Sequence, residues 1–215
     1  VETLARVDCL NLDKTGTVTI GRPTVSTVKA LPGFDETTVL RLAAGLETGS
    51  EHPLAQAILN AARERGLTVP ALERFEAIPG HGASGSVESR SLLVGNRPLL
   101  ETAGIDTAPL ATESERLAAN GQTPVLVAID DRAAGIIAVA DLLKPDAAAA
   151  IRRLRDLGLR VALLTGDHTA TARAIAAEAG IDAVFAEVTP TVKGKVIADF
   201  QARGEVVGMV GDGIN

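Results

Sequence analysis

Tryptophan and tyrosine are absent from the 215 residues, and aromatic side chains make up only 2% of them. A purine bound by this chain therefore cannot stack on a Trp or Tyr ring. Basic residues are outnumbered, with 21 Lys and Arg against 27 Asp and Glu, and the formal net charge is −6. Because a nucleic-acid surface needs clustered positive charge, this balance excludes nucleic acid as a partner.

Cysteine and long apolar runs are scarce as well. Cys9 is the single cysteine, so an internal disulfide framework and a thiolate metal cluster are excluded. The longest nearly continuous apolar run, residues 133–140, is far shorter than the roughly 20 residues that a membrane-spanning helix needs. No signal segment opens the chain. Because its last residues lie in a glycine-rich stretch, we interpret the chain as a piece of a longer protein that does not itself span a membrane.

Two different patterns divide the chain. An apolar run at residues 7–12 predicts a buried strand, and from residue 146 onward helical and apolar strand-like segments alternate. The predicted helices are residues 147–157, 169–179 and 191–203, and the predicted strands are residues 160–164, 183–188 and 206–210. A glycine follows each helix, as C-terminal capping favours. The alternation predicts an α/β domain with a Rossmann-like parallel sheet covered on both faces.

The opening strand can join that sheet only if the middle of the chain is an insertion. Residues 21–135 contain two helical patterns, near residues 39–46 and from Pro53 onward, and several short strand-like runs. Asp130-Asp131 predicts a hairpin turn between two of these runs, residues 124–129 and 135–139. We therefore expect an inserted α+β domain with an antiparallel sheet at residues 21–135, and a first domain made of residues 1–20 and 136–215.

Polar residues follow the predicted parallel strands at the edge where ligands bind such sheets. They are Asp13 after the first strand, Thr165, Gly166 and Asp167 after the second, Lys193 beyond the third, and Asp212 after the fourth. This set suits phosphoryl transfer: a carboxylate nucleophile at Asp13, Mg²⁺ shared by Asp13 and Asp212, and oxygen-binding groups at Thr165 and Lys193. Any one of them, taken alone, is explained as well by an ordinary strand-end turn.

Three strings of residues resemble the phosphorylation motifs of P-type ATPases, which belong to the haloacid-dehalogenase superfamily. They are DKTGT at residues 13–17, TGD at residues 165–167 and MVGDGIN at residues 209–215. The resemblance implies that Asp13 is phosphorylated, with Lys14 in the same catalytic signature. It also implies that the Thr15 carbonyl and Asp212 bind Mg²⁺. Superfamily phosphatases usually have an Asp where Thr15 stands, so an aspartyl-phosphate on Asp13 is expected to persist, as a pump requires.

Residues 50–55, SEHPLA, resemble the signature of heavy-metal-transporting pumps within that family, in which Glu51 and His52 would contact the adenine of ATP. The resemblance also implies nucleotide contacts at Gly80, Gly82, Gly95 and Asn96, and at Gly166 and Asp167. The glycines of residues 80–85 lack the strand–turn–helix context of a dinucleotide-binding fold, so that fold is not expected. Without its flanking string, His52 would be interpreted as a structural residue.

These observations predict the ATP-binding and phosphorylation headpiece of a heavy-metal pump, with Cu⁺ favoured over zinc or cadmium. Its substrate is ATP, its cofactor Mg²⁺, and its partners the actuator domain and transmembrane helices of the same parent chain, so we expect the cytoplasmic portion of an integral membrane protein. Because ATP and Asp13 would belong to different domains, closure is expected to bring them together. Two alternatives stay open: a soluble phosphatase or phosphotransferase on the same fold, and a non-catalytic nucleotide-binding module.

Overall fold

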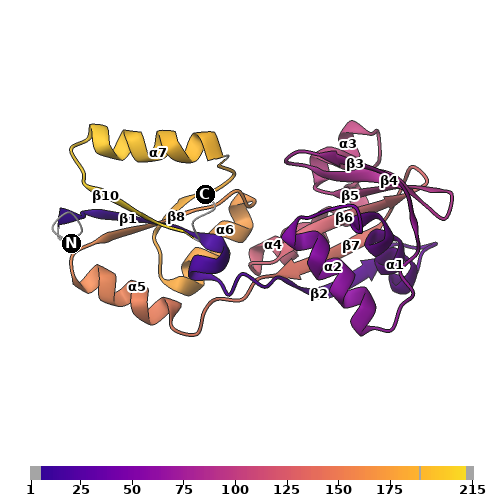
Figure 1. Ribbon diagram of the computed structural model, residues 1–215, viewed down its shortest axis with the longest axis horizontal. Coiled ribbons are helices and arrows are strands. Elements are labelled where there is room, and N and C mark those ends of the chain that lie inside the picture. The colour runs from indigo at the N-terminus through magenta and orange to yellow at the C-terminus, as the bar shows by residue number, and fades with distance from the viewer. Residues whose placement is uncertain (1–5, 189, 212–215) are drawn as a thin grey trace. The chain divides into compact units, whose positions relative to one another are not determined.

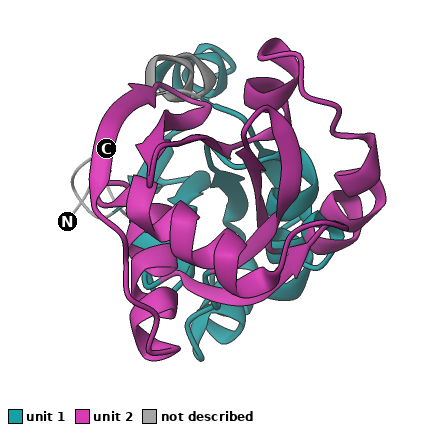
Figure 2. Ribbon diagram, turned by 90° about the vertical axis from the view of Figure 1, so that its right-hand side faces the viewer, with its two compact units in different colours: residues 1–22, 118–121, 141–215 teal, residues 23–117, 122–140 magenta. Residues whose placement is uncertain are grey.

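The computed structural model describes residues 6–188 and 190–211, without the side chains of residues 190–193, 195 and 196. The chain divides into two compact units (Figure 2). Unit 1 consists of residues 1–22, 118–121 and 141–215, and unit 2 of residues 23–117 and 122–140. Each unit is built around its own core.

Unit 1 contains the expected parallel sheet. Its strands are β1 (Cys9–Asp13), β8 (Arg160–Leu164), β9 (Ala183–Phe185) and β10 (Val207–Val210). The order is β10-β1-β8-β9, and every neighbouring pair is parallel. The first strand of the chain thus pairs with strands about 150 and 200 residues later, so the middle of the chain lies between neighbouring strands of this sheet.

Helices lie on both faces of this sheet (Figure 1). They are α5 (Ala147–Asp156), α6 (Thr169–Ala179) and α7 (Pro190–Ala202). Leu10 and Leu12 of β1 belong to the same apolar cluster as Ile151 of α5 and Ile175 of α6, which puts these two helices on one face. The helix α7 covers the other face. The predicted strand at residues 183–188 is shorter than expected and ends at Phe185.

Unit 2 is an antiparallel sheet in the order β2-β7-β6-β5-β4-β3. Its strands are β2 (Thr24–Ala30), β3 (Leu72–Ile78), β4 (Gly82–Val87), β5 (Arg90–Gly95), β6 (Thr123–Ile129) and β7 (Arg132–Ala140). The antiparallel α+β architecture was predicted. The sequence did not predict β2, β3 or β4, whose short, mixed runs lack a strict alternation of apolar and polar residues.

Helices also cover both faces of this second sheet. They are α1 (Glu36–Glu47), α2 (Pro53–Glu64), α3 (Arg97–Thr102) and α4 (Ala108–Ala119). The alternation of β6 explains the two layers: Val125, Val127 and Ile129 pack in the α1–α2 cluster, whereas Leu126 and Ala128 pack in the α3–α4 cluster. No helix among the described residues is long and apolar enough to cross a membrane.

Two hairpin turns carry non-glycine residues with left-handed backbone. Asp130 and Asp131 (φ 49° and 60°) join β6 to β7, as the sequence predicted. Glu88 and Ser89 (φ 51° and 57°) make the same kind of turn between β4 and β5, without the Asn or Gly that would announce it. The boundaries between the two units differ slightly from the expected ones. Since β7 runs unbroken to Ala140 and pairs there with Thr24 of β2, the boundaries lie at residues 22/23 and 140/141, a few residues beyond the expected 20/21 and 135/136.

Candidate phosphorylation and nucleotide site

Asp13 is the last residue of β1, at the carboxyl end of the parallel sheet, and is only 7% exposed. It is the register partner of Leu164, the last residue of β8, so Thr165 follows at the same edge. Thr165 is also buried, and its Oγ1 accepts a hydrogen bond of 3.1 Å from the amide of Asp167. The strand pairing therefore brings a carboxylate and a hydroxyl together, as phosphoryl transfer would require.

Lys14 and Asp167 form an ion pair at this edge. Lys14 is buried, and the carboxylate of Asp167 is largely covered too. Opposite charges removed from water stabilise each other only if they stay paired. Lys14 is thus placed to fix the loop after Thr165, and its charge compensates a neighbouring carboxylate beside the nucleophile.

The residues after Asp13 suit a hard cation such as Mg²⁺, which takes oxygen ligands. Thr15 is extended (φ −71°, ψ 126°) and Gly16 is left-handed (φ 74°), so the chain makes a sharp turn next to the Asp13 carboxylate. Within the described part of the chain, no group of three or more His, Cys, Asp or Glu could hold a metal ion. The predicted ligand Asp212 lies outside the described residues. Lys193 lies in α7, but its side chain falls outside the description as well.

His52 is the N-cap of α2 in unit 2. Its Nδ1 accepts a hydrogen bond of 3.2 Å from the amide of Leu54. Because an accepting imidazole nitrogen carries no proton, the proton of the neutral ring lies on Nε2. The ring itself is exposed. The structural and the functional interpretation of His52 are therefore compatible: one nitrogen caps the helix, and the other is a donor.

Glu47 is a residue that the sequence analysis missed. It is the last residue of α1 and only 7% exposed, whereas the predicted Glu51 is exposed. Burial raises the pKa of Glu47 to about 7, against a smaller opposing effect of a hydrogen bond from Ser50. A buried acid with a perturbed pKa is a candidate for a functional site. Its position five residues before His52 carries no pattern that would distinguish it from a surface helix residue.

The predicted glycines have different roles. Gly82 and Gly95 are register partners in β4 and β5, and a Cβ on Gly82 would lie 2.2 Å from the carbonyl oxygen of Val94. A Cβ on Gly95 would lie 2.2 Å from the carbonyl oxygen of His81. Close contact between the two strands thus requires both glycines. Gly80 differs: it is left-handed (φ 77°) and faces open space, so a ligand could approach its backbone.

Asn96 ties the turn of Gly80 and His81 to the start of α3. Its Nδ2 donates to the carbonyl of Gly80 (3.0 Å), and its Oδ1 accepts from the amide of Leu99 (3.1 Å). The Nδ1 of His81 lies 3.3 Å from the same Oδ1. The structure therefore joins the predicted residues Gly80, Gly82, Gly95 and Asn96 into one cluster, held together mainly by contacts among themselves.

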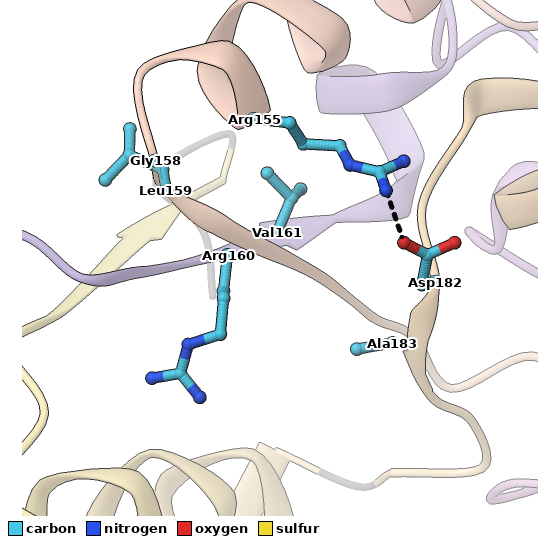
Figure 3. A pocket seen from close by; sticks show the side chains of 7 residues that line it. All are labelled: Arg155, Gly158, Leu159, Arg160, Val161, Asp182 and Ala183. Atoms are coloured by element: carbon cyan, nitrogen blue, oxygen red, sulfur yellow. Dashed lines mark ion pairs between the residues drawn. The ribbon is translucent and has the colours of Figure 1, made fainter.

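A hollow of about 370 Å³ lies elsewhere on unit 1 (Figure 3). Arg160 and Ala183, at the amino ends of β8 and β9, line it, so it lies at the sheet edge opposite Asp13. Arg155 points across it to Asp182, at 2.7 Å, and Arg160 pairs with Glu205. Since both arginines are already neutralised, this hollow adds nothing to the phosphoryl site.

The fold and the strand-end carboxylate define a class of protein. Residues 7–215 match the haloacid dehalogenase-like hydrolase family, and the chain belongs to that family. The structure agrees with this assignment. It places a buried Asp13 at the end of the first strand of a parallel sheet, and Thr165 directly after the end of the neighbouring strand.

Within that class, the chain is similar over its whole length to copper pumps. It is 47% identical over 215 residues to Copper-transporting ATPase 2 of Rhizobium meliloti (strain 1021), and 46% identical to the Copper-exporting P-type ATPase of Bacillus subtilis (strain 168). Each comparison covers 100% of this chain but only 26% and 27% of the relative. The chain thus spans about a quarter of the length of these curated relatives. The resemblance to heavy-metal P-type ATPases is confirmed.

Solved structures agree. A zinc-transporting PIB-type ATPase in its E2.Pi state superposes with a TM-score of 0.69 at 38% identity, over 99% of this chain and 34% of that one. The catalytic CPx-ATPase domain CopB-B superposes with a TM-score of 0.73 over 99% of this chain and 74% of that one. At 24% identity the second comparison shows the fold alone. The predicted two-part α/β and α+β architecture is confirmed.

Proposed function

We propose that this chain binds ATP and transfers its γ-phosphoryl group to Asp13, as the catalytic part of a pump for monovalent copper. The observation that carries the proposal is the buried Asp13 at the carboxyl end of β1, in a chain 47% identical to a copper-transporting ATPase. Since the chain spans about a quarter of that relative, transport itself and the actuator and membrane partners belong to the proposed parent protein.

In the proposed reaction, a carboxylate oxygen of Asp13 attacks the γ-phosphorus. The bond from that phosphorus to the bridging oxygen breaks, and ADP leaves with the electron pair. Thr165 and Lys193 hold phosphoryl oxygens as charge moves onto them. Asp13, the Thr15 carbonyl and Asp212 would hold Mg²⁺, which when bound neutralises charge on the phosphates. Lys14 stays paired with Asp167 and keeps the rim of the site in place.

For the purine, we propose a pair of groups in unit 2. The Nε2–H of His52 donates to a ring nitrogen, as its capping bond from Leu54 dictates. Glu47 is half protonated near neutral pH, so its buried carboxyl group can both donate to and accept from an adenine edge. This assignment replaces Glu51, whose exposed side chain has no comparable environment. Gly80 provides the open backbone for the rest of the nucleotide.

Incubation with γ-³²P-ATP and Mg²⁺ tests the central claim. We expect acid-stable label on the chain that hydroxylamine removes, because hydroxylamine cleaves acyl phosphates. Asp13→Asn should abolish the label while ATP still binds in isothermal titration. A labelled Asp13→Asn variant would place the nucleophile elsewhere, and binding without any label on the parent chain would favour the non-catalytic nucleotide-binding module.

A soluble phosphatase is the second candidate, and Thr15 separates the two. The residue two places after the nucleophile lacks the carboxyl group that would activate water. We therefore expect little turnover of p-nitrophenyl phosphate, and rapid hydrolysis would support the phosphatase instead. In the full-length parent, ATP hydrolysis should respond to Cu⁺ more than to zinc or cadmium; a preference for zinc would follow the zinc-transporting structural neighbour rather than the copper relatives.

A further inference from the structure

Lys144 lies just after the point where the chain re-enters unit 1, at residue 141, and its side chain contacts the loop that follows Asp13. Its Nζ donates a hydrogen bond of 2.6 Å to the carbonyl of Gly16, 128 residues earlier in the chain. Its backbone amide donates at 3.0 Å to the carbonyl of Val18. A single residue therefore binds two carbonyls of the loop at residues 14–18. The charge of the ammonium group makes the bond to Gly16 stronger than one between neutral groups.

Thr19 anchors the start of the same loop. Its amide donates to the carbonyl of Lys14 (3.0 Å), and its Oγ1 lies 3.0 Å from that carbonyl and 2.6 Å from Oδ2 of Asp141. Asp141 is buried, and its Oδ1 accepts from the amides of Gly21 and Arg22 at 3.0 and 3.2 Å. The segment at residues 141–144 thus holds the loop on both sides of the left-handed Gly16: Asp141 acts through Thr19 on the Lys14 side, and the Lys144 amide bonds to the Val18 carbonyl.

We propose that Lys144 is a positioning residue for phosphorylation: it holds the Gly16 turn so that Asp13 and the Thr15 carbonyl can share one Mg²⁺. The inference rests on the proposed function of Asp13. Gly16 is left-handed and follows the extended Thr15. When nothing holds its carbonyl, such a glycine has alternative backbone conformations of similar energy, because glycine occupies both halves of the backbone map. A bond from a side chain of a distant segment removes those alternatives before the cation arrives, which improves its binding.

The test uses the 215-residue chain with Mg²⁺ and beryllium trifluoride, an analogue of an acyl phosphate on Asp13, followed by ¹⁹F NMR. Lys144→Met keeps the aliphatic stem and removes the ammonium group. We expect the Mg²⁺ concentration for half-saturation to rise about tenfold, the scale of one charge-assisted hydrogen bond. Lys144→Arg should restore it to within about threefold, since arginine can donate to the same carbonyl.

Arg152→Met, at an exposed position on α5, is the matched control and should leave the Mg²⁺ requirement unchanged. ATP affinity, measured by titration, should stay within about twofold in every variant, because the groups proposed to bind the purine, His52 and Glu47, belong to unit 2 and are not altered. Thr19→Val removes the other anchor and should raise the Mg²⁺ requirement in the same direction. That variant keeps the test decisive if Lys144→Met folds poorly.

Two results would overturn this inference without touching the proposed function. One is an unchanged Mg²⁺ requirement in folded Lys144→Met or Thr19→Val. The other is a loss of ATP affinity as large as the rise in the Mg²⁺ requirement, which would show a general structural defect. If the unaltered chain took up neither beryllium trifluoride nor phosphate, the proposed function of Asp13 would fail first. The two failures are therefore distinguishable.

Discussion

Asn11 is a buried polar residue in unit 1 whose side chain lacks a hydrogen-bond partner among the described residues. It lies in β1, two residues before Asp13, and is 0% exposed. Neither its Oδ1 nor its Nδ2 has a hydrogen-bond partner among the described residues. Each buried polar group without a partner costs about 1–3 kcal/mol. Judged from the part of the chain that the structure describes, Asn11 therefore weakens the sheet beside the proposed nucleophile.

Replacing Asn11 by valine removes both polar atoms and introduces a branched side chain that suits a strand. We expect Asn11→Val to stabilise unit 1 by about 1–3 kcal/mol, measured by native-state hydrogen exchange of the β1 and β8 amides. Asn11→Asp is the control and should destabilise it, because a buried charge is costlier than a buried amide. A destabilising valine would show that Asn11 has a partner in the working protein.

Glu47 gives unit 2 a pH dependence of known sign. Burial raises its folded-state pKa from 4.5 to about 7. Between these values the unfolded chain has lost the proton that the folded chain keeps, so stability falls as pH rises from about 5 to 8. A shift of this size corresponds to a loss on the order of 2–3 kcal/mol across that range.

We expect Glu47→Gln to remove this fall, because the amide cannot ionise. Urea unfolding followed by circular dichroism at pH 5, 6, 7 and 8 measures it, with the exposed Glu51→Gln as the matched control that should keep the slope. A slope that survives in Glu47→Gln would assign it to other groups.

At the scale of elements, β4 and β5 depend on the facing pair Gly82 and Gly95. An alanine at Gly82 would place a methyl group 2.2 Å from the Val94 carbonyl oxygen, at a backbone φ of 143°. Overpacking and backbone strain together should cost about 2–5 kcal/mol. Gly80→Ala meets no atom within 4 Å and should cost only the left-handed backbone term, about 1–2 kcal/mol. Differential scanning calorimetry compares the two, and equal losses would argue against close strand packing as the reason for Gly82.

The elements with strict periodicity could be predicted from the sequence. The strand at Arg160–Leu164 and the helix at Thr169–Ala179 have the predicted bounds, because each is an apolar or amphipathic run that a glycine limits. The strands β3 and β4 could not be predicted. Residues of β3 such as Glu73, Arg74 and Glu76 are exposed, and its pairing with β4 depends on glycines that suggested a loop.

The site divides in the same way. Asp13 and Thr165 could be placed because parallel strands bring their carboxyl ends to one edge. Glu47 could not, since its raised pKa comes from burial in the folded unit, which no local sequence pattern announces. The contact between Lys144 and Gly16 could not be predicted either. The two residues are 128 positions apart, and they meet only because the chain re-enters unit 1 after β7.

At the scale of the whole chain, unit 2 has the properties of an independent domain. Its two apolar clusters, on the two faces of the sheet, draw all their members from residues 23–140. Thr24 and Ala140 are register partners in β2 and β7, so the chain enters and leaves the unit at adjacent positions. Closing such an insertion costs unit 1 little beyond loop entropy, which grows slowly with length.

We therefore expect residues 23–140, expressed alone, to fold and to bind ATP within about threefold of the affinity of the full chain. Dispersed amide resonances in a ¹H–¹⁵N spectrum check the fold, and isothermal titration checks the affinity. His52→Ala in this segment should weaken binding by about 1 kcal/mol, the scale of one hydrogen bond. The segment should take no label from γ-³²P-ATP, because it lacks Asp13. An unfolded segment would show that unit 1 contributes to the core of unit 2, and a folded segment without affinity would move the nucleotide site out of unit 2.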